Sequence, residues 1–426
     1  MIQEFNHIES VSGELFLPGD KSISHRALIF SSLGNGKSVI SNLSNAEDVN
    51  STKGILQNCG IDILNDDSKI SVFGKGIWGL LKPEKILYAG NSGTTARLLA
   101  GLLTMQKFGS VISGDESLSK RPMNRVTKPL IQMGAKLSLT GNNYLPIRIE
   151  PSESLKAISY ELDVPSAQVK SAILIAGLFL NDVTKVIENV ETRNHTEVML
   201  SLPIQKNGNQ TIISSSIKYA PIPNEYIIPS DISTASFFIV LTLLSKNSTL
   251  IIKNCSLNPS RTGILTVLKA MGAKIEIINQ NISCGEIYGD ILVESSKLVN
   301  VEIDSNIIPN IIDEIPILTI AGIFAEGKFK IKNAKELRVK ESDRINAIVN
   351  NVKKLGLSVE EYEDGFSVSG EIKNNNCLFE SFGDHRIAMA FSILSLLLQQ
   401  SGKINNFECV KISNPQFIAQ LNQIIG

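Results

Sequence analysis

Residues Pro129–Leu139 read PLIQMGAKLSL, and residues Val267–Ile277 read VLKAMGAKIEI. In both stretches an amphipathic run ends at a glycine and an alternating run follows. This pattern predicts a helix closed by a left-handed residue and then a strand. Two further stretches have the same form, ILQNCGIDIL around Gly60 and VKKLGLSVEE around Gly356. The phrase is therefore an internal repeat, which is typical of a fold built from equivalent supersecondary units.

The four glycines of this repeat are 74, 138 and 84 residues apart, close to one, two and one repeat lengths. That spacing places a degenerate copy near position 203, where MLSLPIQ carries Pro203 in place of the glycine. Another copy is expected at the end of the chain, where FIAQLNQIIG closes at Gly426. Six units account for all 426 residues, and each mixes strands with one or two helices. The repeat therefore predicts a mixed α/β fold.

A second sequence similarity, between two more distant segments, divides the chain into two halves. PGDKSISHRALI at Pro18–Ile29 resembles PSDISTASFFIV at Pro229–Val240, and both place Asp and Ser just ahead of an apolar helical run. If these two segments are the points at which the chain passes from one domain to the other, residues 21–229 form a first domain, and residues 1–20 with 230–426 form a second. Single hydrophobic cores stop growing at about 250–300 residues, so the length also favours more than one domain. Neither crossing is a long Gly/Ser/Pro-rich linker, so we expect two hinged halves.

The composition narrows the class of protein. Lys and Arg number 41 against 42 Asp and Glu, so the chain has no generally basic surface for nucleic acid, and any anion site must come from a local cluster. The apolar share of 43% excludes a disordered chain. The five scattered cysteines favour buried thiols in a reducing cytosol. The sequence has no secretory signal and no apolar run of the roughly 18–20 residues that span a bilayer, so we expect a cytoplasmic protein.

The segment LPGDKSISHRAL has the residues of an anion site. Lys21 and Ser22 stand at the expected start of a helix, and Arg26 lies one turn beyond Ser22. A helix N-terminus presents unpaired N–H groups and partial positive charge, so these residues together suit an anion. The alternative is an ordinary N-cap by Ser22 with two surface cations.

A second segment, AGNSGTTARLLAG at Ala89–Gly101, has a similar form. Gly93 would let a ligand approach the backbone closely. Thr94 and Thr95 could cap the following helix, with Arg97 one turn in. A plain helix start is the alternative.

Two more segments concentrate cations. SLSKRPMNRVTKPL carries Lys120, Arg121, Arg125 and Lys128, of which only one need face a ligand, because charge runs are usually solvated. LRVKESDRI places Lys340 and Arg344 at a spacing that would put them on one helix face. Such like charges repel by a few tenths of a kcal/mol unless a bound anion or the neighbouring Glu341 and Asp343 compensate them.

Two short motifs complete the set. FGDHRIAMAF carries Arg386 beside His385, and IIPNIIDEIPIL places Asp313 and Glu314 within an otherwise apolar stretch. A carboxylate among so many Ile residues is either an exposed turn or a buried acid tuned by its surroundings.

Taken in order, these motifs resemble the 5-enolpyruvylshikimate-3-phosphate synthase family. The resemblance covers essentially the whole chain and rests on LPGDKSISHRAL, GNSGTTARLL, KRPM, DVPSAQVKSAIL, RNHTE, IDEIP, RVKESDR and GDHRIAM. It implies the two-domain enolpyruvyl transferase fold, in which each domain has three repeated β-α units arranged as an inside-out α/β barrel and a cleft lies between the domains. It also implies transfer of the enolpyruvyl group of phosphoenolpyruvate to the 5-hydroxyl of shikimate 3-phosphate, in the shikimate pathway to chorismate and the aromatic amino acids.

The resemblance assigns the site residue by residue. It assigns the binding of shikimate 3-phosphate to Lys21, Ser22, Arg26, Ser166, Ala167, Gln168, Arg193, Asp313 and Lys340. Ala167 stands where many members have a second Ser, so only its backbone can contribute. It assigns the binding of phosphoenolpyruvate to Lys21, Gly93, Arg121, Gln168, Arg344 and Arg386. Catalysis falls to Asp313, Glu341 and Lys21, with Asp313 as base for the hydroxyl and Glu341 as the group that gives and retakes a proton at carbon.

The same resemblance implies a monomer that needs no metal or redox cofactor and has no nucleic-acid or membrane partner. Two other functions remain open at this stage. The sister enolpyruvyl transferase acting on UDP-N-acetylglucosamine shares the fold, but it commonly has a Cys ahead of its KRPM-like segment, and here no Cys lies between Cys59 and Cys255. A non-catalytic repeat scaffold is the remaining alternative.

Overall fold

The chain divides into two compact units in the computed structural model, which describes residues 1–66 and 69–425. The first unit comprises Gly19–Ile228 and the short segment Ile282–Glu286. The second comprises Met1–Pro18, Pro229–Asn281 and Ile287–Gly426. The domains expected from the sequence, residues 21–229 and residues 1–20 with 230–426, stay a prediction. Gly426, where the last repeat was expected to close, lies outside the described residues.

The first unit contains three four-stranded sheets in the described part of the chain, with strand orders β14-β3-β5-β4, β6-β7-β9-β8 and β10-β11-β13-β12. In each sheet the first two strands are parallel and the others antiparallel. The strands are β3 (Asn35–Ser41), β4 (Asp62–Asp66), β5 (Lys69–Lys75), β6 (Leu87–Tyr88), β7 (Ser110–Ser113), β8 (Lys136–Thr140), β9 (Tyr144–Glu150), β10 (Ser159–Glu161), β11 (Thr184–Glu188), β12 (Ile204–Asn207), β13 (Gln210–Ser215) and β14 (Glu225–Ile227). The helices are α1 (Lys21–Leu33), α2 (Glu47–Asn58), α3 (Gly93–Thr104), α4 (Glu116–Ser119), α5 (Asn124–Gln132), α6 (Ala167–Gly177), α7 (His195–Met199) and the 3₁₀ turn η1 (Ile217–Tyr219).

The second unit has the sheets β16-β17-β15-β2, β1-β22-β21 and β18-β20-β19. The strands are β1 (Gln3–Phe5), β2 (Ser12–Phe16), β15 (Thr249–Ser256), β16 (Lys274–Ser283), β17 (Glu286–Glu294), β18 (Phe329–Ile331), β19 (Ser358–Tyr362), β20 (Gly365–Ser369), β21 (Leu378–Glu380) and β22 (Gly402–Asn405). The helices are α8 (Ile232–Leu244), α9 (Gly263–Ala270), α10 (Ile308–Ile311), α11 (Ile315–Phe324), α12 (Arg344–Lys354), α13 (His385–Leu397) and α14 (Phe417–Ile424), with 3₁₀ turns η2 (Ser305–Ile307), η3 (Lys335–Val339) and η4 (Phe407–Ile412).

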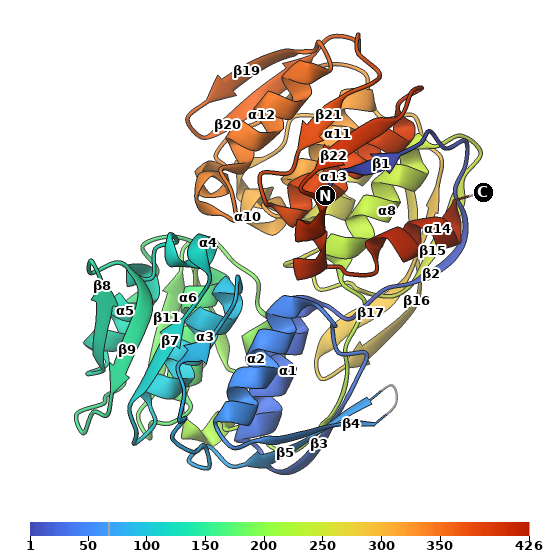
Figure 1. Ribbon diagram of the computed structural model, residues 1–426. Coiled ribbons are helices and arrows are strands. Elements are labelled where there is room, and N and C mark those ends of the chain that lie inside the picture. The colour runs from blue at the N-terminus through green and yellow to red at the C-terminus, as the bar shows by residue number, and fades with distance from the viewer. Residues whose placement is uncertain (67–68, 426) are drawn as a thin grey trace. The chain divides into compact units, whose positions relative to one another are not determined.

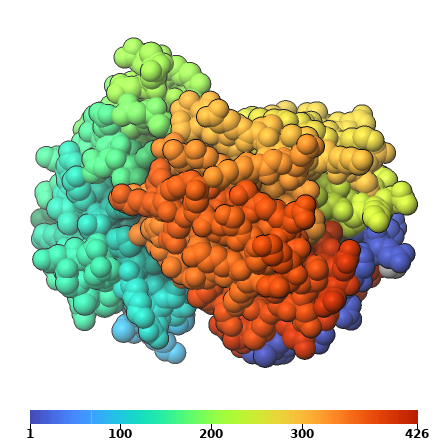
Figure 2. All heavy atoms as spheres, turned by 90° about the horizontal axis from the view of Figure 1, so that it is seen from above, coloured from blue at the N-terminus to red at the C-terminus, as the bar shows by residue number. Residues whose placement is uncertain are grey.

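The start of the chain returns to the second unit. Strand β2 pairs in parallel with β15, and β1 pairs antiparallel with β22. Figure 2 shows the result, with the N-terminal residues in blue against C-terminal residues in red. Two strands from the N-terminus therefore complete two sheets whose other strands come from much later in the chain.

Three helices form the core of each unit. Helices α1, α3 and α6 are almost wholly buried in the first unit, as are α8, α11 and α13 in the second. A helix that is apolar on nearly all sides is stable only when it is covered on all sides, and here sheets flank the helices (Figure 1). The mixed α/β class and the repeated β-α construction predicted from the sequence are confirmed.

The repeat glycines behave as the pattern predicts. Each has a positive φ, and a strand begins two residues later: Gly60 (φ 84°), Gly134 (φ 95°), Gly272 (φ 98°) and Gly356 (φ 79°). In the degenerate copy α7 ends at Met199 and β12 begins at Ile204, directly after Pro203. Ser201, two residues past the end of α7, takes the left-handed conformation there, with φ 49°. Each repeat glycine also lies two residues past its helix, so the position of the glycine is taken by Ser201 and not, as expected, by Pro203.

Two further features bear on the expected environment. All five cysteines are free thiols; four are buried, and Cys284 is half-buried. Within residues 1–66 and 69–425 no single helix has the length and apolarity to cross a membrane, although one bent pair, Ser305–Ile311 with Ile315–Phe324, meets the length and composition test jointly.

Candidate functional site

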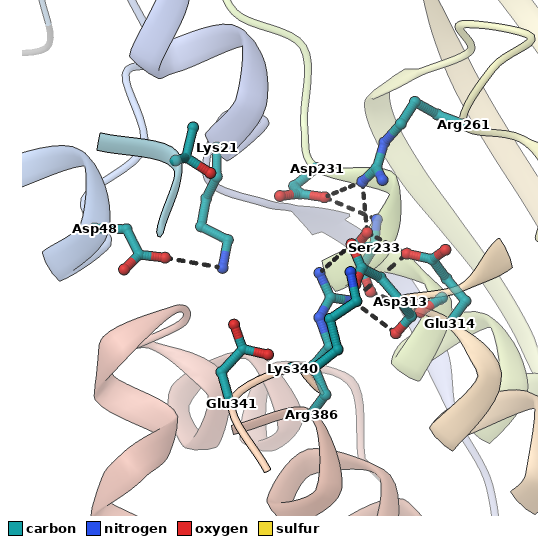
Figure 3. A network of polar contacts seen from close by, with 12 residues as sticks. Lys21, Asp48, Asp231, Ser233, Arg261, Asp313, Glu314, Lys340, Glu341 and Arg386 are labelled. Atoms are coloured by element: carbon teal, nitrogen blue, oxygen red, sulfur yellow. Dashed lines mark hydrogen bonds and ion pairs between the residues drawn. The ribbon is translucent and has the colours of Figure 1, made fainter. Parts of the chain in front are cut away.

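Helix α1 opens on two of the residues assigned to substrate binding. Its N-cap is Asp20, whose Oδ1 accepts a hydrogen bond from the Ile23 N–H at 3.0 Å. The alternative of a cap by Ser22 is therefore wrong, because the helix begins one residue before Ser22. Lys21 is the first helical residue, and its Nζ lies 3.7 Å from Asp48 Oδ2 (Figure 3).

Arg26 is buried and held on three sides. Its Nη1 donates to the Ser22 carbonyl at 2.8 Å, its Nε to Thr196 Oγ1 at 2.8 Å and its Nη2 to Ser171 Oγ at 2.7 Å. Burial lowers the pKa of Arg26 to about 10, partly offset by the charges of Glu197 and Asp20. The guanidinium is therefore still a cation at neutral pH.

Helix α3 begins at Gly93, earlier than a cap by Thr94 or Thr95 would place it. Ser92 is the N-cap, and its Oγ accepts from the Thr95 N–H at 3.1 Å, so the expected caps by Thr94 and Thr95 are wrong. A Cβ on Gly93 would lie 2.7 Å from Arg97 Nη1 and 3.7 Å from Arg121 Nη1. A side chain at this position would therefore force the Arg97 guanidinium to move.

The Arg97 side chain in turn orients Gln168. Arg97 Nη1 donates to Gln168 Oε1 at 2.6 Å, and Gln168 Nε2 donates to Thr94 Oγ1 at 2.9 Å. These two bonds fix which way the amide of Gln168 faces, and they join the start of α3 to the start of α6. The sequence assigned Gln168 to the substrates, whereas it named Thr94 only as a helix cap and Arg97 only as a cation one turn into the helix.

The cations of the SLSKRPMNRVTKPL segment lie in two different environments, exposed and buried. Only the buried one suits a ligand. Lys120 and Lys128 are exposed and pair with Glu116 and Asp163. Arg121 is buried, with 7% exposure, and its Nη2 donates to Asn91 Oδ1 at 2.5 Å. This agrees with the expectation that most of the run is solvated. Asn91 was not foreseen, although it stands in the quoted GNSGTTARLL motif.

The remaining first-unit residues lie at the starts of α6 and α7. Ser166 caps α6, with its Oγ accepting from the Val169 N–H at 3.4 Å, and Ala167 is the first helical residue. Arg193 is half-buried just before α7, and its charge lowers the pKa of Arg26. Arg193 is therefore close enough to Arg26 for the two cations to repel.

The second unit gathers three cations around Asp313, of which Lys340 and Arg386 are labelled in Figure 3. Asp313 Oδ1 lies 3.2 Å from Arg344 Nη1 and 3.7 Å from Lys340 Nζ, and Asp313 Oδ2 lies 3.6 Å from Arg386 Nη2. Arg386 Nη1 also donates to the Asp313 carbonyl at 2.9 Å. Of the two alternatives for this carboxylate, the buried one holds, with 9% exposure.

The expected helix face shared by Lys340 and Arg344 does not exist. The 3₁₀ turn η3 ends at Val339, Lys340 is extended, and α12 begins only at Arg344, behind the N-cap Asp343. Asp313 is what brings the two cations together. Glu341 accepts a short hydrogen bond from Arg344, whereas Asp343 pairs with Arg338, so only one of the two expected compensating acids contacts this pair.

Arg344 is the most heavily compensated cation of this cluster. Its side chain is 1% exposed, and its Nε donates to Asp384 Oδ2 at 2.8 Å. Burial alone would lower the pKa of Arg344, but the Asp384, Glu341 and Asp313 carboxylates raise it above its usual value. Asp384 also caps α13 by accepting from the Arg386 N–H at 2.9 Å. Asp384 was quoted in GDHRIAM but given no role.

A second layer of polar side chains lies behind Arg386. Glu314 is fully buried, with Oε1 3.5 Å from Arg386 Nη1, and it accepts a short hydrogen bond from Ser233 Oγ. Arg261 Nη2 donates to Ser233 Oγ at 2.5 Å and lies 3.6 Å from Asp231 (Figure 3). Ser233 and Arg261 were not foreseen, because nothing in the sequence links them to IDEIP.

The described residues contain no group of three or more His, Cys, Asp or Glu side chains placed to hold a metal ion. Each unit instead presents fixed cations, with carboxylates interspersed in the second. Such an arrangement can bind phosphate and carboxylate groups and move protons.

Comparison with known proteins agrees with this chemistry. The family model of EPSP synthase (3-phosphoshikimate 1-carboxyvinyltransferase) matches residues 5–421. The chain is 48% identical to the 3-phosphoshikimate 1-carboxyvinyltransferase of Petrotoga mobilis, over 97% of each chain. It is 41% identical to that of Salinibacter ruber, over 100% of this chain and 99% of the relative.

Solved structures agree in the fold. EPSP synthase from Acinetobacter baumannii aligns with a TM-score of 0.87 and 37% identity, covering 100% of this chain and 98% of that one. The enolpyruvyl transferase NikO from Streptomyces tendae has the same fold at 13% identity, with a TM-score of 0.76 over 99% of this chain and 97% of that one. The resemblance found in the sequence is confirmed, and the chain belongs to the EPSP synthase (3-phosphoshikimate 1-carboxyvinyltransferase) family of enolpyruvyl transferases.

Proposed function

We propose that the chain carries out its family's reaction with the residues described above. In that reaction the enolpyruvyl group of phosphoenolpyruvate passes to the 5-hydroxyl of shikimate 3-phosphate and inorganic phosphate leaves. The observation that carries the proposal is the Asp313 cluster, in which one buried carboxylate lies within 4 Å of the side-chain nitrogens of Lys340, Arg344 and Arg386. Three cations gathered around a buried carboxylate suit anionic substrates next to an acid that can move a proton.

The acceptor substrate is proposed to bind through side chains that are already held in place. Arg26 supports this role best, because its guanidinium is immobilised before any ligand arrives. A fixed guanidinium loses little further entropy when it binds an anionic group. The full proposed set for shikimate 3-phosphate is Lys21, Ser22, Arg26, Ser166, the backbone of Ala167, Gln168, Arg193, Asp313 and Lys340.

Phosphoenolpyruvate is proposed to bind mainly through arginines. Arg121, Arg344 and Arg386 are each at least 90% buried, so their charges are weakly screened and their positions are fixed by neighbouring side chains. Gly93 keeps the start of α3 open beside Arg97 and Arg121. Lys21 and Gln168 complete the set proposed for this substrate.

The chemical step needs a base and a proton donor. An ionised carboxylate only accepts hydrogen bonds, so Asp313 can take the proton of the attacking 5-hydroxyl. Carbon 3 of the enol must gain a proton as carbon 2 is attacked and lose one as phosphate departs. Glu341, with 22% side-chain exposure, is the carboxyl proposed for both transfers. Lys21, the first residue of α1, is proposed to stabilise the charge that develops on phosphoenolpyruvate.

The two rival readings differ in what they predict. The comparisons do not favour the sister enzyme acting on UDP-N-acetylglucosamine, because the matched family and the relatives carry the 3-phosphoshikimate name. A repeat scaffold would tolerate loss of Asp313 or Glu341 without any functional change. It therefore gives no reason for a carboxylate buried among three cations, a costly arrangement unless it serves a function.

A direct assay tests the proposal. The purified chain is mixed with shikimate 3-phosphate and phosphoenolpyruvate, and release of inorganic phosphate is followed. We expect release with this pair and none when UDP-N-acetylglucosamine replaces the acceptor. Release only with UDP-N-acetylglucosamine, or with neither acceptor, would refute the assignment.

We also propose that the enzyme works as a cytoplasmic monomer with small molecules as its only partners. Its near-neutral net charge of −1 supports the absence of a nucleic-acid partner. Light scattering on the eluting protein gives its mass directly, and a species near 46.4 kDa is expected. A larger mass that persists on dilution would contradict this part of the proposal.

A further inference from the structure

Arg26 is held by hydroxyls from two helices that are far from it in sequence. Thr196 on α7 accepts from Arg26 Nε, and Ser171 on α6 accepts from Arg26 Nη2, while Thr196 Oγ1 donates to Ser171 Oγ at 2.8 Å. Both hydroxyl-bearing residues are fully buried. Together with the Ser22 carbonyl, these groups occupy three of the five N–H donors of the guanidinium.

The two hydroxyls are themselves held in place by a buried ion pair between the residues next to them. Lys170 precedes Ser171 on α6, and Glu197 follows Thr196 on α7. Lys170 Nζ lies 2.7 Å from Glu197 Oε1, and neither side chain is more than 1% exposed. Burial lowers the pKa of Lys170, but the Glu197 and Glu188 carboxylates outweigh it and raise the pKa, so the lysine stays charged.

Helix α7 depends on such anchors because it is very short. It spans only His195–Met199, and so short a helix has no stability of its own. On its other side His195 Nδ1 lies 2.8 Å from Glu286 Oε1, which belongs to the segment Ile282–Glu286 of the same unit. The residue between His195 and Glu197 is Thr196, so the position of its hydroxyl is fixed from both sides.

We propose that Thr196 and Ser171 are positioning residues that aim the Arg26 guanidinium at an anionic group of the acceptor substrate, held in register by the Lys170–Glu197 pair. The inference rests on the proposed function, since it takes Arg26 to bind that substrate. Two acceptors on Nε and Nη2 fix both the plane and the rotation of the guanidinium. In the described part of the chain two N–H donors then remain for a carboxylate or phosphate, the number that a bidentate contact uses.

The test compares substitutions that remove one hydroxyl with one that keeps it. Thr196→Val and Ser171→Ala each remove an acceptor, whereas Thr196→Ser retains it. We expect Thr196→Val to raise both the KM and the directly titrated Kd of shikimate 3-phosphate about tenfold, as for loss of a hydrogen bond to a charged group. The KM of phosphoenolpyruvate and kcat should change less than twofold, and Thr196→Ser should restore the wild-type Kd.

A matched control separates positioning from mere stability. Thr104 is also a buried threonine of the first unit, and its Oγ1 donates to the Ala100 carbonyl within α3 at 2.6 Å. Thr104→Val should lower the Tm without changing the Kd of shikimate 3-phosphate. Equal changes in that Kd for Thr104→Val and Thr196→Val, or an unchanged Kd in Thr196→Val, would overturn the inference.

If the wild-type chain does not bind shikimate 3-phosphate, the proposed function is refuted, but the positioning of Arg26 by Thr196 can still be tested by a second measurement. Solvent exchange of the Arg26 Nε–H can be followed by NMR without any substrate, and its signal is assigned by its loss in Arg26→Lys. In the wild type we expect this proton to be protected, and in Thr196→Val to exchange at least tenfold faster. Equal exchange rates would show that Thr196 does not hold Arg26.

Discussion

Arg344 and Asp384 form a buried charge pair, with Arg344 Nε 2.8 Å from Asp384 Oδ2, although the two residues are 40 positions apart. Neither side chain exceeds 1% exposure. Because Asp384 also caps α13 through the Arg386 N–H, one carboxylate orders two arginines of the proposed phosphoenolpyruvate site. The stability of this cluster and its proposed function therefore depend on the same residue.

Replacing Asp384 with asparagine should destabilise the protein and weaken phosphoenolpyruvate binding together. Removing one partner of a buried pair typically costs about 3–5 kcal/mol, and the asparagine recovers part of that through its own hydrogen bonds. Urea unfolding and the KM of phosphoenolpyruvate are the measurements. The exposed pair of Lys128 with Asp163 provides the control, since Asp163→Asn should leave the Tm unchanged. A stable Asp384→Asn protein with normal kinetics would contradict the role of this pair.

Substituting Asp313 with asparagine should remove most of the activity but leave the fold intact. Loss of a general base typically lowers kcat by about 10²–10⁴. Asp304→Asn is the matched control, because Asp304 is exposed, caps η2 by accepting from the Asn306 N–H, and asparagine caps equally well. Initial rates measure the activity, and circular dichroism checks that the fold is intact. A kcat within tenfold of the wild type would exclude Asp313 as the base.

Gly93→Ala should disturb phosphoenolpyruvate binding with little change in stability. The new Cβ would lie 2.7 Å from Arg97 Nη1, so the guanidinium must move and its bond to Gln168 must stretch or break. A several-fold higher KM for phosphoenolpyruvate is expected. Gly54→Ala in α2 is the control, since a Cβ there meets nothing within 4 Å and alanine favours the helix by about 0.5–1 kcal/mol. The idea fails if both substitutions leave the kinetics unchanged.

Stability should fall in mild acid because of His25. This side chain is buried, its Nδ1 lies 2.7 Å from Thr52 Oγ1, and burial together with Arg26 and Lys21 lowers its pKa from 6.5 to about 3. The unfolded chain then binds a proton that the folded chain does not. The stabilisation is complete above pH 6.5 and is lost as the pH falls toward 3, by an amount on the order of a few kcal/mol.

The measurement for His25 is the free energy of unfolding at pH 7.5 and pH 4.5. His25→Asn keeps a polar group near Thr52 but does not titrate, so the difference between the two pH values should be smaller than in the wild type. An equal difference in both proteins would mean that His25 contributes nothing to the acid sensitivity.

The sequence alone determined the features that depend on near neighbours in the chain. The repeat glycines were predicted correctly because a helix end and the strand after it are governed by residues within one turn of the glycine. The start of α1 was placed within one residue of its true position for the same reason. Family membership was also visible, because its motifs are short and contiguous.

Tertiary structure alone decided which side chains meet. Thr196 lies 170 residues from Arg26, and nothing local marks it as a partner. Lys340 and Arg344 were expected to share a helix, but the chain is extended at Lys340, and the two converge on Asp313 instead. Such contacts come from the packing of separate helices and sheets, which the residues near each side chain do not encode. Local pattern identified the functional segments, and long-range packing set the partners of their charged groups.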